Sequence, residues 1–469
     1  MVHIKKHVKS FLSFLKKSKK SVHVISICSI CWKQRNYIEC ENCHNHDYGK
    51  CYDCGEQKIK RNWCSNCKPL EIIPTFTLWT SGNDKIDQLI QEDQLIPKYH
   101  DWDCWRWIEY NELNDIEYKS KGGFGEVYKA QWNNIPIEYS KYGYSNEVAM
   151  KKLMNSQNIS KDFIKEINAH LKNKYFFIVK IFGITRDPST EEYAIIMRYC
   201  NKGDWKGIIR NKNRSLLWKD RLKMLYKVTI ALSNFHDNGY MHCDIHPGNI
   251  LLNNYTTYLS DLGLCKPADY KSPSGEIYGI IPYMAPEVLR GKSFIPASDV
   301  YSFGMIMWEL TSREAPFNNL PHDQYLILSI CDGLRPQIIK GTPEVYGDLM
   351  RSCWEKDPSN RPTSEELCII IGEWYNASFN KINNPEYYEI FKRADKEMAK
   401  LESTQQHPDS YNVSRPLSKY IIAARAISED SEDSRDTRDD LEIIEVDSLE
   451  ITIDEEISLE ITIDEEIRF

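Results

Sequence analysis

Three oxygen-bearing side chains follow one another at spacings that suit metal-assisted chemistry. Asp244 and Asn249 lie in the string HCDIHPGN at 242–249, and Asp261 opens the tripeptide DLG twelve residues after Asn249. Carboxylate and amide oxygens are ligands that Mg²⁺ prefers, and a carboxylate can also orient an attacking hydroxyl. The ordered set predicts phosphoryl transfer from Mg-ATP, with Asp244 orienting the hydroxyl and Asn249 and Asp261 holding Mg²⁺.

The strings that follow this set are specific and keep a fixed order. They are APE at 285–287, DVYSFG at 299–304, WEL at 308–310, Cys353-Trp354, Asp357-Pro358 and RPT at 361–363. With them, residues 107–376 resemble the catalytic domain of eukaryotic protein kinases. The resemblance implies an α+β, bilobal fold: an N-terminal lobe with an antiparallel sheet and one αC helix, and a mainly helical C-terminal lobe. It also implies a buried ion pair between Arg361 and Glu287.

The same resemblance assigns the nucleotide site. Lys151, in the string VAMK at 148–151, would hold the ATP phosphates, and Glu166 on the αC helix would pair with Lys151. Met197 would be the gatekeeper. The implied nucleotide contacts are Gly122, Gly123, Phe124, Gly125, Val127, Ala149, Lys151, Met197, Tyr199, Cys200 and Leu251.

Three positions depart from the family pattern. His246 replaces the usual Lys of the catalytic loop, Cys243 replaces an Arg, and Ile280 replaces a Thr. An imidazole at 246 can still donate a hydrogen bond to a phosphate oxygen. The substitutions keep open a pseudokinase scaffold that binds nucleotide without transferring phosphate.

A small-molecule phosphotransferase is the second alternative, because aminoglycoside and choline kinases carry a similar catalytic string. Those relatives lack the APE and DVYSFG segments, so we favour an ATP-dependent protein kinase in intracellular signalling. Residues 279–284, GIIPYM, resemble the Ser/Thr pattern. With WEL and RPT they resemble the tyrosine-kinase-like Ser/Thr group, and the layout is similar to the expanded kinase sets of mycorrhizal fungi.

Eight of the fifteen cysteines form four Cys-x-x-Cys pairs near the N-terminus: Cys28/Cys31, Cys40/Cys43, Cys51/Cys54 and Cys64/Cys67. Two such pairs complete one tetrahedral four-sulfur site, so the pattern predicts two structural Zn²⁺ ions in a zinc-ribbon-like module at 24–70. Spacing alone leaves stacked ribbons and an interleaved arrangement open. Disulfides are disfavoured because no secretory signal is visible.

The net charge of −8 is unevenly distributed. Residues 428–469 hold eighteen acidic residues against three Arg, a net of −15, which leaves +7 for the rest. This tail ends in a tandem ten-residue repeat at 448–457 and 458–467, and its composition predicts disorder. Residues 1–23 form a basic amphipathic arm whose first twenty residues carry seven Lys. The arm suits an anionic membrane surface, an acidic protein groove or nuclear import.

The predicted layout has six segments: the arm at 1–23, the zinc module at 24–70, a linker with a short helix at 71–106, the kinase domain at 107–376, a connector at 377–427 and the tail at 428–469. Expected partners are protein substrates and protein partners of the zinc module and tail; nucleic acid is disfavoured. No run of eighteen apolar residues predicts a membrane span. We expect a cytoplasmic location, with the nucleus as a second one.

Overall fold

A computed structural model of the chain describes most positions between residues 49 and 436. The described residues are 26–27, 34–35, 49–58, 63–96, 104–122, 125–137, 139, 144–152, 156–157, 164, 167–168, 170, 177–211, 216–254, 256–268, 277–379, 381–382, 384–397, 407–411 and 413–436. The predicted basic arm at 1–23 lies outside these residues, as does the acidic tail from 437 onward.

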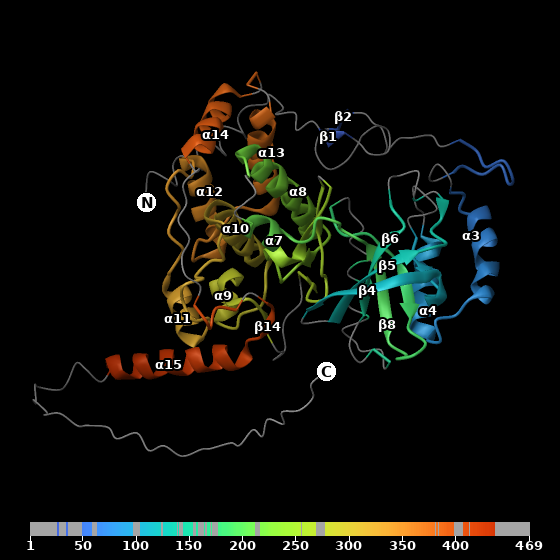
Figure 1. Cartoon of the computed structure of the whole chain (residues 1–469), viewed down its shortest axis with the longest axis horizontal. Coiled ribbons are helices and arrows are strands. Elements are labelled where there is room, and N and C mark those ends of the chain that lie inside the picture. Colours follow the sequence, from blue (N-terminus) through green and yellow to red (C-terminus); the bar gives the residue numbers. More distant parts are fainter. Residues whose placement is uncertain are drawn as a thin grey trace, which may run out of the picture. The chain divides into compact units, whose positions relative to one another are not determined.

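A six-stranded sheet forms the N-terminal lobe (Figure 1). Its order is β3-β7-β8-β6-β5-β4, with bounds Arg106–Trp107, Ile181–Arg186, Tyr193–Arg198, Glu147–Lys152, Gly125–Trp132 and Leu113–Gly122. Five strands pair antiparallel as the sequence predicts, but β3 pairs parallel with β7. Gly183 permits this pairing, because a Cβ there would lie 2.0 Å from the carbonyl oxygen of Arg106.

The helix predicted within the linker is α4, Asp84–Leu95. Asn83 caps it, since its side chain accepts hydrogen bonds from the backbone N–H groups of Lys85 and Ile86. Ile86 and Ile90 lie four residues apart on one face and are fully buried. Each isoleucine buried in this way contributes about 1.5–3 kcal/mol to the stability of the fold.

α4 packs into the N-terminal lobe. Ile86 and Ile90 share a hydrophobic cluster with side chains of β7, β8 and the helical residue Ile167. The Tyr193 hydroxyl on β8 donates to the carbonyl of Ser81 at 2.9 Å. The predicted boundary at residue 107 therefore divides one packing unit.

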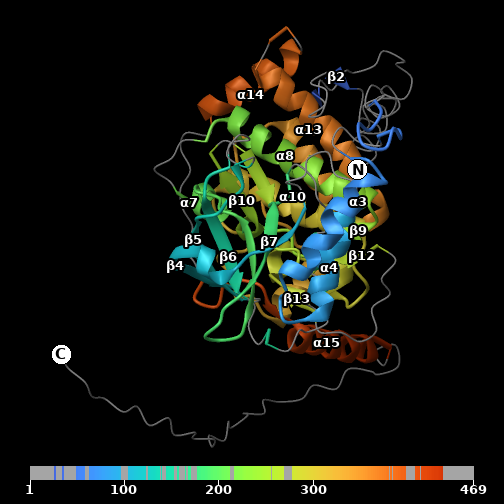
Figure 2. The same ribbon diagram turned by 90° about the vertical axis from the view of Figure 1, so that its right-hand side faces the viewer.

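The C-terminal lobe is mainly helical. Its larger helices are α8 (Trp218–Asp237), α10 (Pro296–Ser312), α12 (Glu344–Cys353), α13 (Ser364–Phe379) and α14 (Pro385–Glu397). Shorter ones are α7 (Trp205–Arg210), α9 (Pro286–Leu289), α11 (Gln324–Asp332) and the 3-10 turns η4 (Pro247–Asn249), η5 (Ile281–Tyr283) and η6 (Pro358–Asn360). α8 and α13 lie side by side in both views (Figures 1 and 2).

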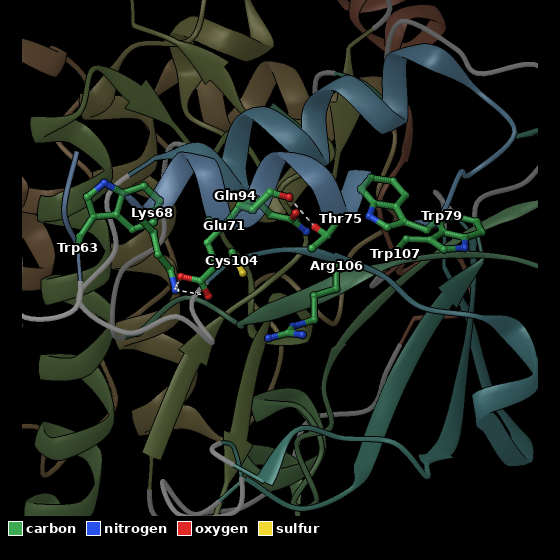
Figure 3. Close-up of a pocket in the computed structure, with 10 residues that line it drawn as sticks. Trp63, Lys68, Glu71, Thr75, Trp79, Gln94, Cys104, Arg106 and Trp107 are labelled. Carbon is green, nitrogen blue, oxygen red and sulfur yellow. Dashed lines mark hydrogen bonds and ion pairs between the residues drawn. The ribbon is translucent and has the colours of Figure 1, made fainter. Parts of the chain in front are cut away.

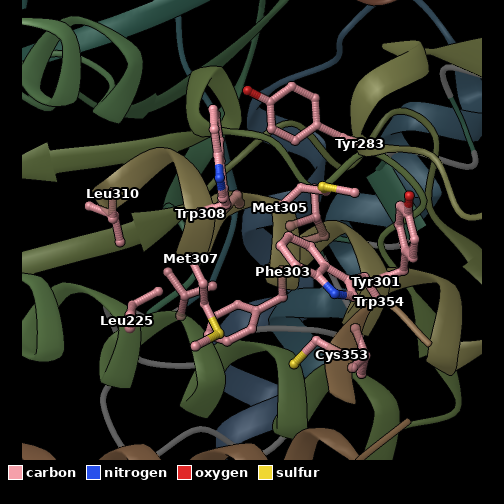
Figure 4. Packing of buried hydrophobic residues seen from close by; sticks show 14 of the residues in the cluster. Leu225, Tyr283, Tyr301, Phe303, Met305, Met307, Trp308, Leu310, Cys353 and Trp354 are labelled. Atoms are coloured by element: carbon pink, nitrogen blue, oxygen red, sulfur yellow. The ribbon is translucent and has the colours of Figure 1, made fainter. Parts of the chain in front are cut away.

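α10 is the centre of the C-terminal core and is buried on all sides. Phe303, Met305 and Met307 are each completely buried and point into the cluster drawn in Figure 4. Gly304 allows α12 to approach, because a Cβ at this position would lie 2.7 Å from the Cβ of Cys353. The close packing fixes the start of α10, which carries a residue of the candidate site.

Short strands frame the loops between the lobes. β9 (Tyr240–Met241) pairs with β12 (Lys266–Pro267), and β10 (Ile250–Asn253) forms an antiparallel hairpin with β11 (Thr256–Leu259). The string at 242–249 therefore lies between β9 and β10, and Asp261 follows β11.

Two further elements come late in the chain. β14 (Arg415–Pro416) pairs antiparallel with β13 (Tyr278–Gly279), and α15 spans Ser418–Asp436. Residues 428–436, predicted to be disordered, are thus helical. Their acidic residues continue the helix that begins at Ser418; Ile421 and Ala424 of this helix, and Leu417 just before it, join the C-terminal core. Among the described residues, no helix is long and apolar enough to span a bilayer.

The N-terminal cysteine region contains little regular structure in its described part. β1 (Ser26–Ile27) and β2 (Gln34–Arg35) form a two-stranded ladder. α3 (Cys67–Ile72) and the 3-10 helix η1 (Ile73–Leu78) then lead toward α4. The 3-10 turn η3 (Tyr110–Glu112) precedes β4.

Candidate active site

Asp299, in the first turn of α10, holds the catalytic string in place. Its two carboxylate oxygens accept hydrogen bonds from the backbone N–H groups of His242 at 2.8 Å and Cys243 at 2.9 Å. The His242 side chain lies 3.0 Å from the carbonyl of Ser260, and burial lowers its pKa. His242 is therefore a neutral positioning residue that ties the loop to the segment before Asp261.

Asp244 and Asn249 come together as the spacing predicts. The Asn249 side-chain amide donates to the Asp244 carbonyl at 3.0 Å and to the Asp244 carboxylate at 3.1 Å. Both side chains are buried. The amide group keeps the carboxylate in one orientation and leaves the Asn249 carbonyl oxygen to serve as a metal ligand.

Lys151 of the N-terminal sheet and Asp261, which follows β11, form an ion pair. The Lys151 ammonium group on β6 lies 2.9 Å from the Asp261 carboxylate. Burial opposes ionisation of Asp261, but the charge and hydrogen bond of Lys151 hold its pKa below the ordinary value. Asp261 is therefore ionised at neutral pH, as a ligand of a hard cation must be.

Several predicted nucleotide contacts surround this ion pair. Val127 on β5 pairs directly with Lys151, and Ala149 pairs with Met197. Met197 and Leu251 pack against a small buried cluster that contains Cys200. The predicted residues Glu166, Gly123 and Phe124 lie outside the described residues, so the pairing of Lys151 with Glu166 stays a prediction. Tyr199 directly follows β8, and Gly122 pairs with Gly125 where β4 meets β5.

Ser414 also reaches this site, and the sequence did not predict it. Its hydroxyl donates to the two carboxylate oxygens of Asp244, at 3.0 and 2.8 Å. Ser414 belongs to the predicted connector and is 170 positions from Asp244. No motif surrounds it, so the sequence held no signal that could have found the contact.

Four cysteines gather at a second, distant site. The sulfur atoms of Cys51, Cys54, Cys64 and Cys67 all lie within 4.8 Å of one another. The Cys51–Cys67 and Cys54–Cys64 sulfur separations are 3.8 and 3.4 Å. A tetrahedral Zn²⁺ with Zn–S bonds of about 2.3 Å needs sulfurs about 3.8 Å apart. The third and fourth Cys-x-x-Cys pairs therefore fit one zinc ion.

Local hydrogen bonds favour thiolate at one of these sulfurs. The backbone N–H groups of Cys67 and Asn66 lower the pKa of the Cys64 thiol to about 7. The remaining predicted ligands, Cys28, Cys31, Cys40 and Cys43, lie outside the described residues.

Comparison with known proteins agrees with this geometry. Residues 116–371, more than half of the chain, match the model of the protein tyrosine and serine/threonine kinase family. The chain belongs to this kinase family.

Individual relatives each match more than half of the kinase. A protein of Acanthamoeba polyphaga mimivirus, named as a serine/threonine-protein kinase/receptor, is 30% identical over 302 residues, which are 60% of this chain and 17% of that protein. Human mitogen-activated protein kinase kinase kinase 7 is 28% identical over 270 residues, 56% of this chain and 42% of the relative. The match thus spans less than half the length of either relative.

His246 of the kinase replaces the usual Lys but keeps a donor directed at the site. Its Nδ1 accepts a hydrogen bond from the backbone N–H of Gly248 at 3.1 Å, so a neutral ring carries its proton on Nε2. Nε2 lies 3.5 Å from the Asp244 carboxylate. The imidazole can therefore present one N–H to the reacting groups.

Replacing His246 with Ala should lower kcat by about 10- to 100-fold, because a hydrogen bond to a charged group contributes about 1.5–3 kcal/mol. His246→Lys, which restores the usual residue, should match or exceed the wild-type rate. Steady-state kinetics on a Ser-containing peptide at saturating ATP would measure both variants. An Ala variant with wild-type kcat would show that the imidazole takes no part.

A cavity of about 430 Å³ lies away from these catalytic groups (Figure 3). Side chains of α3, η1, α4 and β3 line it, including Arg106 and Trp107 of β3, together with Trp63, which precedes α3, and Trp79, which follows η1. Lys68 and Glu71 form an ion pair at 3.1 Å along its wall. The cavity lies where the cysteine region meets the N-terminal lobe, and none of the catalytic residues lines it.

Proposed function

We propose that the chain transfers the γ-phosphate of ATP to Ser or Thr hydroxyl groups of proteins. The observation that carries this proposal is a pair of linked contacts: Lys151 lies 2.9 Å from Asp261, and Asn249 holds Asp244. Ser260, next to Asp261, joins the two by donating its backbone N–H to the Asn249 carbonyl at 2.9 Å. Family membership implies ATP and Mg²⁺ as cofactors, and the donor set fits them. Asn249 and Asp261 would hold Mg²⁺, which neutralises the phosphate charge, while Lys151 would hold the phosphates.

The chain's own residues then have separate tasks. Asp244 orients the attacking hydroxyl and takes up its proton, and His246 donates a hydrogen bond nearby. Asn249 fixes the Asp244 carboxylate through its amide group. Asp299 holds the backbone that carries all three.

The finer assignment to the tyrosine-kinase-like Ser/Thr group is part of this proposal. It is supported by the strings WEL at 308–310, RPT at 361–363 and GIIPYM at 279–284. The named relatives include serine/threonine-protein kinases, which supports the same substrate class.

Labelled ATP, Mg²⁺ and a mixture of Ser-, Thr- and Tyr-containing peptides provide the direct test. Acid hydrolysis of the products should yield phosphoserine and phosphothreonine. Phosphotyrosine alone, or phosphate only on small alcohols such as choline or an aminoglycoside, would overturn the proposed substrate class. Mg²⁺-dependent ATP binding without any transfer would favour the pseudokinase scaffold.

We further propose that the cysteine region binds structural zinc, with one ion held by Cys51, Cys54, Cys64 and Cys67. The sulfur separations support this site. A second ion held by Cys28, Cys31, Cys40 and Cys43 follows from the sequence pattern alone. We expect this region and the acidic tail to bind protein partners.

Metal analysis of the purified protein should find two equivalents of zinc, and the double variant Cys51→Ser/Cys64→Ser should bind only one. Removing two of four thiolates leaves too few ligands for a tetrahedral site. Mass spectrometry of the metal after dialysis would measure the loss. Cys368→Ser, on α13 and outside the cluster, is the matched control. An unchanged zinc content in the double variant would remove these cysteines from the metal site.

A further inference from the structure

The chain's own C-terminal segment lies against the candidate active site. β14 pairs with β13, with Arg415 opposite Gly279 and Pro416 opposite Tyr278. The backbone N–H of Leu417 continues the ladder by donating to the carbonyl of Ile277 at 2.7 Å. The segment after Ser414 is therefore bound as an added strand, which is one common way for an extended peptide to be held by a folded domain.

Apolar residues anchor the segment on its C-terminal side. Leu417 is completely buried, and Ile421 and Ala424 on α15 are 3% exposed; all three belong to the main core cluster of the C-terminal lobe. Arg425 of α15 donates to the carbonyl of Arg290, the residue after α9, and Arg415 of β14 donates to the carbonyl of His322, just before α11. The anchor fixes the position of the residues that precede it.

Polar and cation–π contacts hold the segment on both sides of Ser414. His322, which is buried, donates its backbone N–H to Asp409 at 2.9 Å, and its Nδ1 accepts from the backbone N–H of Tyr411 at 3.0 Å. The Arg415 guanidinium lies over the rings of Tyr411 and Tyr420, with its carbon 3.9 and 4.7 Å from the centroids. Ser414 is thus held by contacts of the residues before it and of the residues after it.

The held residue presents its hydroxyl to the catalytic carboxylate. Ser414 Oγ lies 2.8 and 3.0 Å from the Asp244 oxygens and 3.5 Å from His246 Nε2. This is the distance at which a general base takes a proton from its substrate. Asp244 already has a side-chain partner in Asn249, so satisfying a buried carboxylate does not by itself call for a serine here.

We propose that Ser414 is a phosphorylation site of this chain and that the same chain phosphorylates it. The inference rests on the proposed kinase function and names one substrate of it. With a residue that lacks a hydroxyl at position 414, the segment could only obstruct the active site. Serine instead supplies the class of nucleophile that the proposed reaction uses.

The step balances with MgATP as the phosphate donor. Ser414 Oγ forms a bond to the γ-phosphorus, and the bond from that phosphorus to the β,γ-bridging oxygen breaks. The electron pair of the broken bond stays on the bridging oxygen, and ADP leaves. The hydroxyl proton passes to the Asp244 carboxylate and then to solvent, so the products are phosphoserine 414, ADP and one proton.

The new phosphate would change how the segment binds. Phosphoserine carries a charge of about −1.5 to −2 at neutral pH and would face the Asp244 carboxylate at hydrogen-bonding distance. Like charges this close repel, and the neighbouring donor on the catalytic loop, His246 Nε2, is 3.5 Å from the Ser414 hydroxyl. Phosphorylation therefore weakens the binding of the segment around Ser414 and makes Asp244 accessible to other protein substrates.

Phosphosite mapping tests the proposal directly. The full chain incubated with Mg²⁺ and ATP should carry about one phosphate at Ser414, and Ser414→Ala should lower total incorporation at least 10-fold. The initial rate per molecule should stay constant over a 100-fold range of protein concentration. Ser414 without phosphate, in a chain that phosphorylates a separate peptide, would overturn the proposal.

A docking variant and its matched control test the anchoring. Leu417→Asp places a charge at a completely buried position and should lower phosphorylation of Ser414 at least 10-fold while raising the rate on a separate peptide. Ile422→Asp introduces the same charge on the same segment at a side chain that is 65% exposed, and should behave as wild type. Equal Ser414 phosphorylation in the two variants would contradict the docked arrangement.

Two further outcomes separate the inference from the proposed function. In the first, the inactive Asp244→Asn chain is mixed with active chain. If Ser414 of the inactive chain is phosphorylated as fast as Ser414 of the active chain, the intramolecular step is overturned. Transfer to a separate peptide by Ser414→Ala, without Ser414 phosphorylation in the wild type, would refute the inference and leave the kinase function intact. No transfer by wild type, Ser414→Ala or Leu417→Asp to any acceptor would refute both.

Discussion

Asp244→Asn is expected to lower phosphoryl transfer by about 10²- to 10⁴-fold, the usual contribution of a positioned general acid or base. The amide has nearly the shape of the carboxylate, so the loop held by Asp299 should keep its conformation. It cannot take up the proton of the attacking hydroxyl. Initial rates with labelled ATP and a Ser-containing peptide would measure the loss.

Nucleotide binding should survive this change, because Lys151 and Asp261 make their own ion pair and do not depend on the Asp244 carboxylate. A thermal shift with Mg²⁺ and ATP should therefore be similar for variant and wild type. Asp84→Asn, an exposed position in the first turn of α4, is the matched control and should retain full activity. An Asp244→Asn protein with more than a tenth of the wild-type rate would argue against Asp244 as the base.

Arg361→Ala is expected to destabilise the fold by about 3–5 kcal/mol, because it leaves a buried carboxylate without its partner. The resemblance implied this pair, and the structure shows it: Arg361 makes two parallel hydrogen bonds of 2.8 Å to the Glu287 carboxylate. Both residues are 7% exposed. Arg361 also donates to the carbonyls of Ala297 and Glu355, so the loss detaches three segments at once.

Urea unfolding followed by fluorescence would measure this destabilisation. Arg351→Ala is the matched control, since Arg351 pairs with Asp348 at the surface, where an ion pair contributes about 0–1 kcal/mol. A difference below 1 kcal/mol between the two variants would show that the Arg361 pair contributes no more than a surface pair.

The Arg361 pair also predicts a pH dependence. Burial opposes ionisation of Glu287, but Arg361 holds its pKa below the ordinary value of 4.5. A carboxylate with a lowered pKa in the folded state stabilises the fold above its ordinary pKa. The contribution of Glu287 should therefore be complete at neutral pH and decline as the pH falls below about 4.5.

The sequence alone could predict the contacts between site residues that lie close together along the chain. Asp244 and Asn249 are five residues apart, so one turn of the loop brings them together. Lys151 and Asp261 are 110 positions apart, and only the family pattern placed them in one site. Which two of the four similar Cys-x-x-Cys pairs share one zinc ion depends on how the chain folds. The spacing of the cysteines does not determine this.

The packing of segments outside the family pattern could not be predicted. The spacing of Ile86 and Ile90 predicted an amphipathic helix, but nothing in the pattern named the surface that would bury them. Ser414 lies in a polar stretch without periodicity. Its position depends on Leu417 and on His322, which is 92 positions earlier in the sequence. Long-range contacts of this kind follow from tertiary packing rather than from local preference.

The parallel strand β3 also has a consequence for aggregation. An exposed sheet edge presents a row of unpaired N–H and C=O groups that can pair with another chain. In this protein, Arg106 and Trp107 cover the edge of β7 at Gly183 and Ile184, and the kinase family pattern begins only at residue 116. A chain shortened to the family pattern would uncover this edge together with the apolar surface beneath α4. α4 and β3 therefore protect the N-terminal lobe from self-association.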